Sequence, residues 1–337
     1  MVINFKEYNL QLAHTFRISR EAYNSQPTLI VSIYHEGKTG YGEATSNPYY
    51  KITTQRMIEE IIAVKEEIEN LSFTTPEVFY KDLAQFNLSN FTLCALDLAA
   101  NDLYGKLQNT PLYRLWGTSN HHYPITNYTL GIDTIPKMIA KMKERPWPIY
   151  KIKLGTYQDV AIVTALRKYT DAVFRIDANC AWTAFETILN APKLKKLGVE
   201  FIEQPLKPTH LEGMKEVKEK SVLPIIADES CIVESDVDDC IPYFHGVNIK
   251  LVKCGGLTPA RRMIANAKAN KLKVMAGCMT ESTVGISAIA QLLPQLDYVD
   301  MDGAMLLKED IATGVQIKDD GTVVFPEQGG SGIQMLA

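Results

Sequence analysis

The stretch YKIKLG at residues 150–155 decides the fold that this sequence predicts. Alternate side chains of a β-strand share a face, so Lys151 and Lys153 point one way while Ile152 and Leu154 point the other. Two neighbouring ammonium groups lose hydration and repel each other when they are buried. On its own the pair is more typical of a solvated edge strand, because buried lysine is rare. Burial would require fixed negative charge nearby, and the sequence downstream supplies it.

Short β-branched segments alternate with helical segments from about residue 123 onward. Their spacing is close to the length of one strand, loop and helix, which favours βα units and a parallel sheet. The predicted strands cover residues 125–130, 150–154, 173–177, 199–203, 224–228, 246–250, 273–276 and 298–300. Eight such units favour a closed α/β barrel of the TIM type, in which functional groups lie at the carboxyl ends of the strands.

Residues 1–121 predict a separate and smaller α+β domain, in which a short antiparallel sheet precedes helices. The polar segment 14–26, which carries Arg17 and Arg20, is predicted to be a loop. The predicted strands cover residues 2–12, 28–34 and 39–42, and the predicted helices cover residues 53–70 and 90–107.

The barrel is predicted to occupy residues 122–310, and a tail is predicted at 311–337. Within the tail, Asp319, Asp320 and Gly321 have the composition of a tight turn. We therefore expect a hairpin that packs back onto the first domain.

The composition is that of a globular chain, with 46% hydrophobic and 22% charged residues among 337. The net charge of −4 argues against nucleic acid or an anionic membrane surface as a partner. We expect no secretory leader and no membrane span, because no apolar run approaches the length of a bilayer crossing. The six cysteines are scattered without metal-ligand spacing, which is typical of free thiols in the cytoplasm. The oligomeric state is left open.

Charged residues follow the apolar strands of the predicted barrel. Asp177, Glu203 and Asp228 end three consecutive strands, so their carboxylates are expected to converge. Three neighbouring carboxylates do not all stay ionised without a cation, and an oxygen-only ligand set suits Mg²⁺. The alternative is that each carboxylate caps the helix after its strand. Three in consecutive units beside lysine-bearing strands favour the metal site.

Lys250 lies on the strand after the carboxylate cluster, and Lys153 lies on the strand before it. The two amines are expected to face each other across the barrel mouth. The metal and the neighbouring ammonium groups should hold one lysine neutral, as a general base requires. Lys253 is interpreted as a loop lysine, and Lys250 as the buried one.

This combination of residues resembles the enolase superfamily, specifically its muconate-lactonizing subgroup. As a set the motifs are highly specific, and the resemblance extends over nearly the whole chain, including residues 40–44 and 95–106. The matching motifs are Lys-x-Lys at 151 and 153, Asp177 with Asn179, Glu203 in IEQP, Asp228 in ADES, and Lys250 in NIK.

The resemblance implies a (β/α)₇β modified TIM barrel under an α+β capping domain. It also implies Mg²⁺ bound by the three carboxylates, acid/base lysines at 153 and 250, and Lys151 either at the substrate carboxylate or supporting Lys153. Asn179 and Glu229 are expected to lie behind the metal ligands. A lysine on each face would remove the proton α to a carboxylate and return it on the other side, while the metal and Lys151 stabilise the enediolate.

Asp300, Met301 and Asp302 at the eighth strand resemble the dipeptide epimerases of that subgroup, in which an Asp-x-Asp pair binds the free amino group of a dipeptide. The expected reaction is epimerisation of the C-terminal residue of a dipeptide. A turn or cap at Gly303 is the alternative interpretation of the pair. Arg17 and Arg20 are candidates for binding an acidic substrate side chain, and a role as solvated loop arginines is equally open. Apolar dipeptides also remain open as substrates.

Related chemistries would keep the same lysines and carboxylates, namely o-succinylbenzoate synthase, N-acylamino-acid racemase and muconate cycloisomerase. None of them needs Asp300 and Asp302 to face an ammonium group. A non-catalytic metal-binding barrel is a further alternative. The lysine pair argues against it, because a scaffold has no use for two opposed buried cations.

Overall fold

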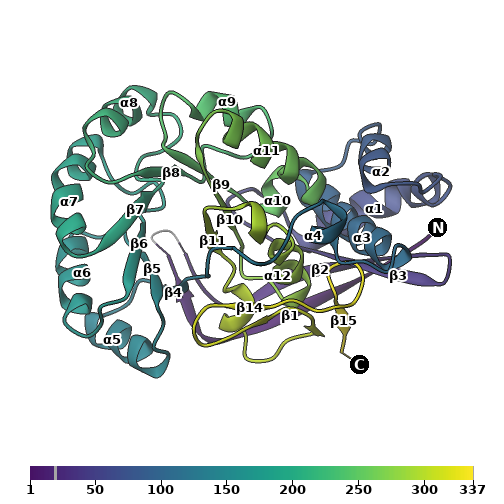
Figure 1. Ribbon diagram of the computed structural model, residues 1–337, viewed down its shortest axis with the longest axis horizontal. Coiled ribbons are helices and arrows are strands. Elements are labelled where there is room, and N and C mark those ends of the chain that lie inside the picture. The colour runs from purple at the N-terminus through teal and green to yellow at the C-terminus, as the bar shows by residue number, and fades with distance from the viewer. Residues whose placement is uncertain (19–20, 337) are drawn as a thin grey trace.

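The computed structural model describes residues 1–18 and 21–336, and its centre is an eight-stranded parallel sheet curved into a barrel (Figure 1). The strands lie close to the predicted segments, because most of their residues are apolar and buried on both faces of the sheet. The order in the sheet follows the chain from β4 to β11. The strands are β4 (Tyr128–Leu130), β5 (Ile149–Lys153), β6 (Val173–Asp177), β7 (Val199–Glu203), β8 (Ile225–Ala227), β9 (Gly246–Ile249), β10 (Lys273–Gly277) and β11 (Tyr298–Asp300).

Helices cover the outside of the barrel, as Figure 1 shows for α5 to α9 along its left and upper rim. The predicted α/β barrel is therefore confirmed. Local signals set some boundaries: Thr183 and Glu186 form a reciprocal capping box at the start of α7. The helices are α5 (Ile135–Glu144), α6 (Asp159–Arg167), α7 (Ala184–Lys196), α8 (Leu211–Lys220), α9 (Asp236–Cys240), α10 (Leu251–Cys254), α11 (Leu257–Ala269) and α12 (Thr283–Ala290), with 3₁₀ turns η1 (Leu293–Gln295) and η2 (Gly303–Leu306).

The first and last strands of the barrel are joined through side chains. The backbone N–H of Thr129 donates to Asp302 Oδ2 at 2.5 Å. The backbone N–H of Met301 donates to Thr126 Oγ1 at 3.0 Å. Arg175 on β6 reaches across the interior and donates to the carbonyl of Val299 on β11 at 3.0 Å. These bonds hold the β4–β11 side together, so the groups at the ends of both strands keep a fixed position.

The N-terminal domain caps the carboxyl ends of the barrel strands. Its sheet runs β1 (Val2–Arg17), β2 (Ala22–His35) and β3 (Lys38–Thr45), and its helices are α1 (Thr54–Glu69), α2 (Pro76–Leu83), α3 (Asn90–Leu107) and α4 (Leu112–Leu115). Gly40 and Gly42 permit the close packing of β3 on α3, since a Cβ at either position would lie 2.1 Å from a helix carbonyl. This packing holds the sheet of the capping domain against α3.

The predicted loop at residues 14–26 was largely wrong. The pairing of β1 with β2 continues beyond a register shift between Gln11 and Phe16, so that Phe16 pairs with Tyr23 and Arg17 pairs with Ala22. Exposure on both faces removed the alternation that would have predicted a strand. The two strands therefore form a long ribbon that reaches the mouth of the barrel.

The tail contains the expected hairpin, with β13 (Gln316–Ile317) paired to β14 (Val323–Val324). Further along, β12 (Ala312–Thr313) pairs with β15 (Gln334–Met335). The backbone of Ser331 donates to Asp102 Oδ1 on α3 at 2.8 Å, so the tail contacts the capping domain. The domain division at residues 121 and 310 stays a prediction. Within residues 1–18 and 21–336, no helix combines the length and apolarity needed to cross a bilayer.

Candidate active site

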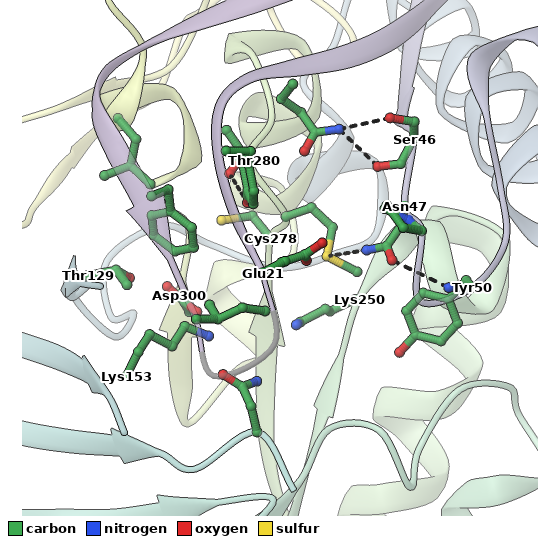
Figure 2. Close-up of a pocket in the computed structure, with 18 of the residues that line it drawn as sticks. Glu21, Ser46, Asn47, Tyr50, Thr129, Lys153, Lys250, Cys278, Thr280 and Asp300 are labelled. Atoms are coloured by element: carbon green, nitrogen blue, oxygen red, sulfur yellow. Dashed lines mark hydrogen bonds between the residues drawn. The ribbon is translucent and has the colours of Figure 1, made fainter. Parts of the chain in front are cut away.

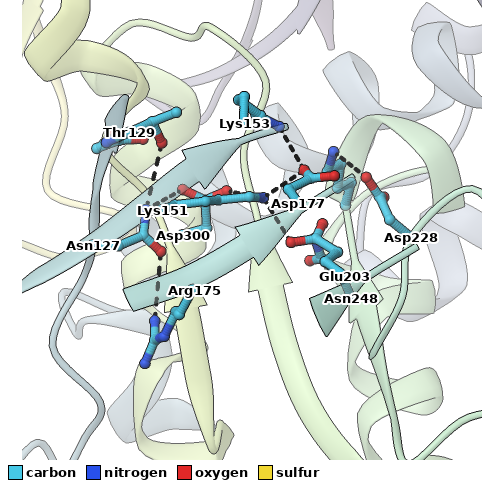
Figure 3. A network of polar contacts seen from close by, with 12 residues as sticks. Asn127, Thr129, Lys151, Lys153, Arg175, Asp177, Glu203, Asp228, Asn248 and Asp300 are labelled. Carbon is cyan, nitrogen blue, oxygen red and sulfur yellow. Dashed lines mark hydrogen bonds and ion pairs between the residues drawn. The ribbon is translucent and has the colours of Figure 1, made fainter. Parts of the chain in front are cut away.

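Three carboxylates converge at the carboxyl ends of β6, β7 and β8. Asp177 and Glu203 are the last residues of their strands and pair in register, and Asp228 directly follows β8. One oxygen from each lies within 4.8 Å of the others, and all three residues are almost fully buried. The predicted convergence of these side chains is therefore present in the fold (Figure 3).

Lys151 lies in the middle of this negative charge. Its Nζ is 2.7 Å from Asp300 Oδ2, 2.8 Å from Glu203 Oε2 and 3.2 Å from Asp177 Oδ2. Burial lowers the pKa of Lys151, but the surrounding carboxylates outweigh burial and raise it well above its ordinary value. Lys151 is a fixed cation beneath the site, and it is not among the residues that line the cavity above.

The three carboxylates have the donor set of a Mg²⁺ site. They offer only oxygen atoms, at the open end of a barrel, which suits a hard cation that keeps several ligand positions free. Glu203 is fully buried, and its Oε2 atom forms an ion pair with Lys151 Nζ at 2.8 Å. Burial together with Asp177 raises the pKa of Glu203 to about 7. A buried cluster of three carboxylates, one of which resists ionisation, fits a bound divalent cation.

Two further lysines flank the carboxylates. Lys153 ends β5 and places Nζ 2.6 Å from Asp177 Oδ2, and Lys250 follows β9 and places Nζ 2.8 Å from Asp228 Oδ2. The strands β5 and β9 are separated by the three strands that carry the carboxylates. Both amines line the same cavity, and Figure 2 shows them reaching into it from two sides.

The expectation that the metal and neighbouring ammonium groups hold one lysine neutral stays a prediction, because the charge of Lys250 follows here from the protein groups alone. Burial lowers the pKa of Lys250, but Asp228 outweighs burial and raises it above its ordinary value. Among the protein groups alone, Lys250 is therefore an ammonium. A cation on Asp228 would weaken this effect.

The interpretation of Lys253 as a loop lysine was wrong. Lys253 lies on α10 and is 1% exposed. Its Nζ donates to Asp228 Oδ1 at 2.7 Å, to the carbonyl of Cys231 at 2.8 Å and to the carbonyl of Asp228. Lys250 and Lys253 thus bind opposite oxygens of one carboxylate, which fixes the orientation of Asp228.

Asp300 and Asp302 lie at the end of β11 and line the cavity beside Cys278. Asp300 accepts hydrogen bonds from Lys151 and from Asn127 Nδ2, each at 2.7 Å. Burial opposes the ionisation of Asp300, but Lys151 lowers the pKa of this carboxyl below its ordinary value. Burial and the charge of Asp300 raise the pKa of Asp302 to about 8. Asp300 is therefore ionised, and a cation brought close to Asp302 would favour its ionisation as well. The pair is suited to bind an ammonium group.

The remaining predicted site residues differ in their positions. Asn179 and Glu229 line the cavity, and the backbone N–H of Asn179 donates to Asp177 Oδ1 at 3.0 Å. Arg17 is exposed at the end of β1 and is not among the cavity-lining residues. Arg20 lies outside the described residues.

A second pair of buried carboxyls, not anticipated from sequence, lies where the capping domain meets the barrel. Glu43 on β3 accepts hydrogen bonds from the backbone N–H groups of Ser282 and Gly285 at the start of α12, at 3.0 and 2.9 Å. Glu281 precedes this helix, and burial together with Glu43 raises its pKa to about 8. No sequence signal could have found the pair, because its members are more than two hundred positions apart.

Replacing Glu281 with glutamine is expected to stabilise the protein increasingly as the pH rises. A carboxyl whose pKa is raised by folding favours the folded state fully below its ordinary pKa near 4.5, and loses this contribution as the pH rises through about 8. The melting temperature of the variant should equal that of the wild type near pH 4.5 and exceed it by roughly 5 °C at pH 8.5. Calorimetry across this range is the measurement, and a constant difference would contradict it.

Comparison with known proteins identifies the class. Residues 136–337 match the enolase C-terminal domain-like family, and residues 3–117 match the N-terminal domain of mandelate racemase / muconate lactonizing enzyme. The chain belongs to this family within the enolase superfamily.

Individual proteins similar to this chain indicate a particular activity within the family. An L-Ala-D/L-amino acid epimerase of a Maribacter species is 66% identical over 99% of both chains, and one from Flavobacterium johnsoniae is 58% identical over the full length of both. Among solved structures, a dipeptide epimerase from Enterococcus faecalis with Mg and L-Leu-L-Tyr matches with a TM-score of 0.93 and 30% identity, covering 98% of each chain.

Proposed function

We propose that this chain is a magnesium-dependent dipeptide epimerase, an isomerase that inverts the α-carbon of the C-terminal residue of a dipeptide. The observation that carries the proposal is the pair of buried amines, Lys153 and Lys250, on either side of the carboxylate cluster. The relatives that are 66% and 58% identical over nearly the full length are epimerases, which supports the same activity here.

The chain's own residues provide a route for the proton. One lysine, as the neutral amine, takes the α-proton from one face of the substrate, and the other lysine, as the ammonium, donates a proton to the opposite face. Lys151, a fixed cation between Asp300 and Glu203, offsets negative charge that develops on the substrate carboxylate. When it is bound, Mg²⁺ at Asp177, Glu203 and Asp228 supplies Lewis-acid stabilisation of that carboxylate.

The position of Asp300 and Asp302 favours a dipeptide over other substrates of the family. Both carboxyls line the cavity that contains the two lysines. A dipeptide carries a free ammonium group that can ion-pair with them. The substrates of an N-acylamino-acid racemase, an o-succinylbenzoate synthase or a muconate cycloisomerase have no such group, and would leave these carboxyls without a charged partner. We therefore place those reactions second.

Two further properties are part of the proposal. The six cysteines form no disulfide, which supports a reducing cytoplasm as the location. We also keep the division into a capping domain at 1–121, a barrel at 122–310 and a tail at 311–337.

The proposal is tested by incubating the enzyme and Mg²⁺ with L-Ala-L-Met in D₂O. We expect loss of the ¹H signal of the methionine α-proton together with formation of L-Ala-D-Met. N-acetyl-L-Ala-L-Met is the matched control, because acetylation removes the ammonium group and leaves the reacting carbon unchanged, and it should react far more slowly. Faster turnover of the acetylated substrate would favour the N-acyl alternatives. Absence of exchange with a panel of dipeptides would contradict epimerase activity.

A further inference from the structure

The junction of β4 and β11 contains a buried asparagine that does not reach the cavity. Asn127 directly precedes β4, is fully buried and is not among the residues that line the cavity. Its Nδ2 donates to Asp300 Oδ1 at 2.7 Å, at the end of β11. Because β4 and β11 stand at opposite ends of the strand order, the contact between them is made by side chains such as this one.

Arg175 determines which way the Asn127 amide faces. The guanidinium lies in the barrel interior, where Nη1 donates to the carbonyl of Val299 at 3.0 Å and lies 3.5 Å from Asn127 Oδ1. Glu200 accepts from Arg175 Nε at 2.9 Å and holds the guanidinium in place. An arginine only donates hydrogen bonds, so the amide atom beside it is the oxygen. The amide nitrogen of Asn127 is therefore directed at Asp300 (Figure 3).

Asp300 connects this interior network to the cavity. Lys151 donates to Oδ2 and Asn127 donates to Oδ1, each at 2.7 Å, so one donor holds each oxygen of the carboxylate. An ionised carboxylate has about four acceptor positions, so two remain for a ligand. Because Asp300 lines the cavity, a donor in the ligand can reach them. Without Asn127, the Oδ1 atom would lose its partner and the carboxylate would be free to turn about Lys151.

The second carboxyl of the pair is held from the same strand by the backbone. The N–H of Thr129 on β4 donates to Asp302 Oδ2 at 2.5 Å. The segment at β4 thus holds Asp302 through its main chain and Asp300 through the side chain of Asn127. Only the side-chain contact can be removed by substitution, so Asn127 is the residue through which this arrangement can be tested.

We propose that Asn127, oriented by Arg175, is a positioning residue for the ammonium group of the substrate. The inference rests on the proposed function, in which Asp300 and Asp302 bind the free ammonium of a dipeptide. Asn127 does not touch the substrate. It orders Asp300 during folding, so that the cost of ordering this carboxylate does not fall on binding. The ammonium group takes no part in the proton transfer, so its contacts contribute equally to the bound substrate and to the transition state, and their loss raises KM while kcat is retained.

The test measures kcat and KM of the Mg²⁺-loaded enzyme for L-Ala-L-Met, together with the inhibition constant of N-propionyl-L-methionine, the same molecule without its amino group. Asn127→Leu has a similar size and lacks the amide, and it should raise KM by about tenfold while kcat changes by less than about twofold. The inhibition constant should stay the same, because this inhibitor has no ammonium group for Asp300 to bind. Asn127→Val, whose β-branched side chain suits a strand, provides the same measurement if the leucine variant does not fold.

Asn101→Leu is the matched control. Asn101 is a buried asparagine on α3 that donates to the carbonyl of Asp97 at 2.8 Å and does not line the cavity. This variant should have a lower melting temperature and an unchanged KM. An unchanged KM in a folded Asn127 variant would overturn the inference, and so would a KM and an inhibition constant that rise by the same factor. Both results would leave the epimerase activity intact, whereas failure of the wild type to epimerise any dipeptide would overturn the proposed function itself.

Discussion

Replacing either Lys153 or Lys250 with methionine is expected to slow epimerisation severely while preserving proton exchange from one stereoisomer. Each variant keeps one amine, which can remove and return a proton on its own face only. The lost acid/base group should reduce epimerisation by about 100-fold to 10,000-fold. In D₂O, one variant should exchange the α-proton of L-Ala-L-Met and the other that of L-Ala-D-Met, as ¹H NMR can measure.

Lys215→Met is the control for these variants, because Lys215 is an exposed lysine on α8. It should epimerise both isomers at the wild-type rate. If both active-site variants lost exchange with the same isomer, the two amines would not act on opposite faces. The proposed inversion would then have no route.

Replacing Asp228 with asparagine is expected to weaken Mg²⁺ binding and to destabilise the fold. Asp228 accepts hydrogen bonds from Lys250 and Lys253, and both ammonium groups would lose their charged partner in the interior. Removing one member of a buried ion pair costs about 3 to 5 kcal/mol. Titration calorimetry should show reduced Mg²⁺ affinity, and the rise in melting temperature on adding Mg²⁺ should shrink.

Asp239→Asn provides the matched control, since Asp239 is exposed on α9. The control should keep both the affinity for Mg²⁺ and the unfolding temperature of the wild type. An Asp228→Asn protein that binds Mg²⁺ as tightly as the wild type would exclude Asp228 as a metal ligand. A protein that loses the metal but keeps full stability would exclude its role in balancing the two lysines.

The positions of the carboxylates and lysines of the site were predictable because these residues lie within, at the end of, or directly after buried barrel strands. Asp177, Glu203 and Lys250 are charged residues that come directly after apolar residues of a strand. Parallel strands bring such positions to one end of the barrel. Lys253 was missed for a local reason. The short helix α10 begins at Leu251 and turns this side chain back toward Asp228, and strand periodicity gives no indication of such a turn.

Other features depend on pairing between distant segments. The long ribbon of β1 and β2 crosses a register shift and is solvated on both faces, so its outer half carries no alternation that predicts a strand. The contact of Glu43 with α12 joins the two domains, and neither segment encodes it alone. The contribution of Phe16 and Tyr23 to the cavity was missed for the same reason, because only the fold brings this ribbon to the barrel mouth.

The four buried lysines at the site have a consequence for the metal-free protein. Lys151, Lys153, Lys250 and Lys253 each bind a carboxylate that belongs to the cluster or borders it. Their ammonium groups already balance most of the negative charge that a divalent ion would otherwise have to neutralise before the chain could collapse. We therefore expect the chain to fold in the presence of a chelator and to bind its ion afterwards and reversibly, so that loading would follow the free magnesium concentration instead of being fixed at synthesis.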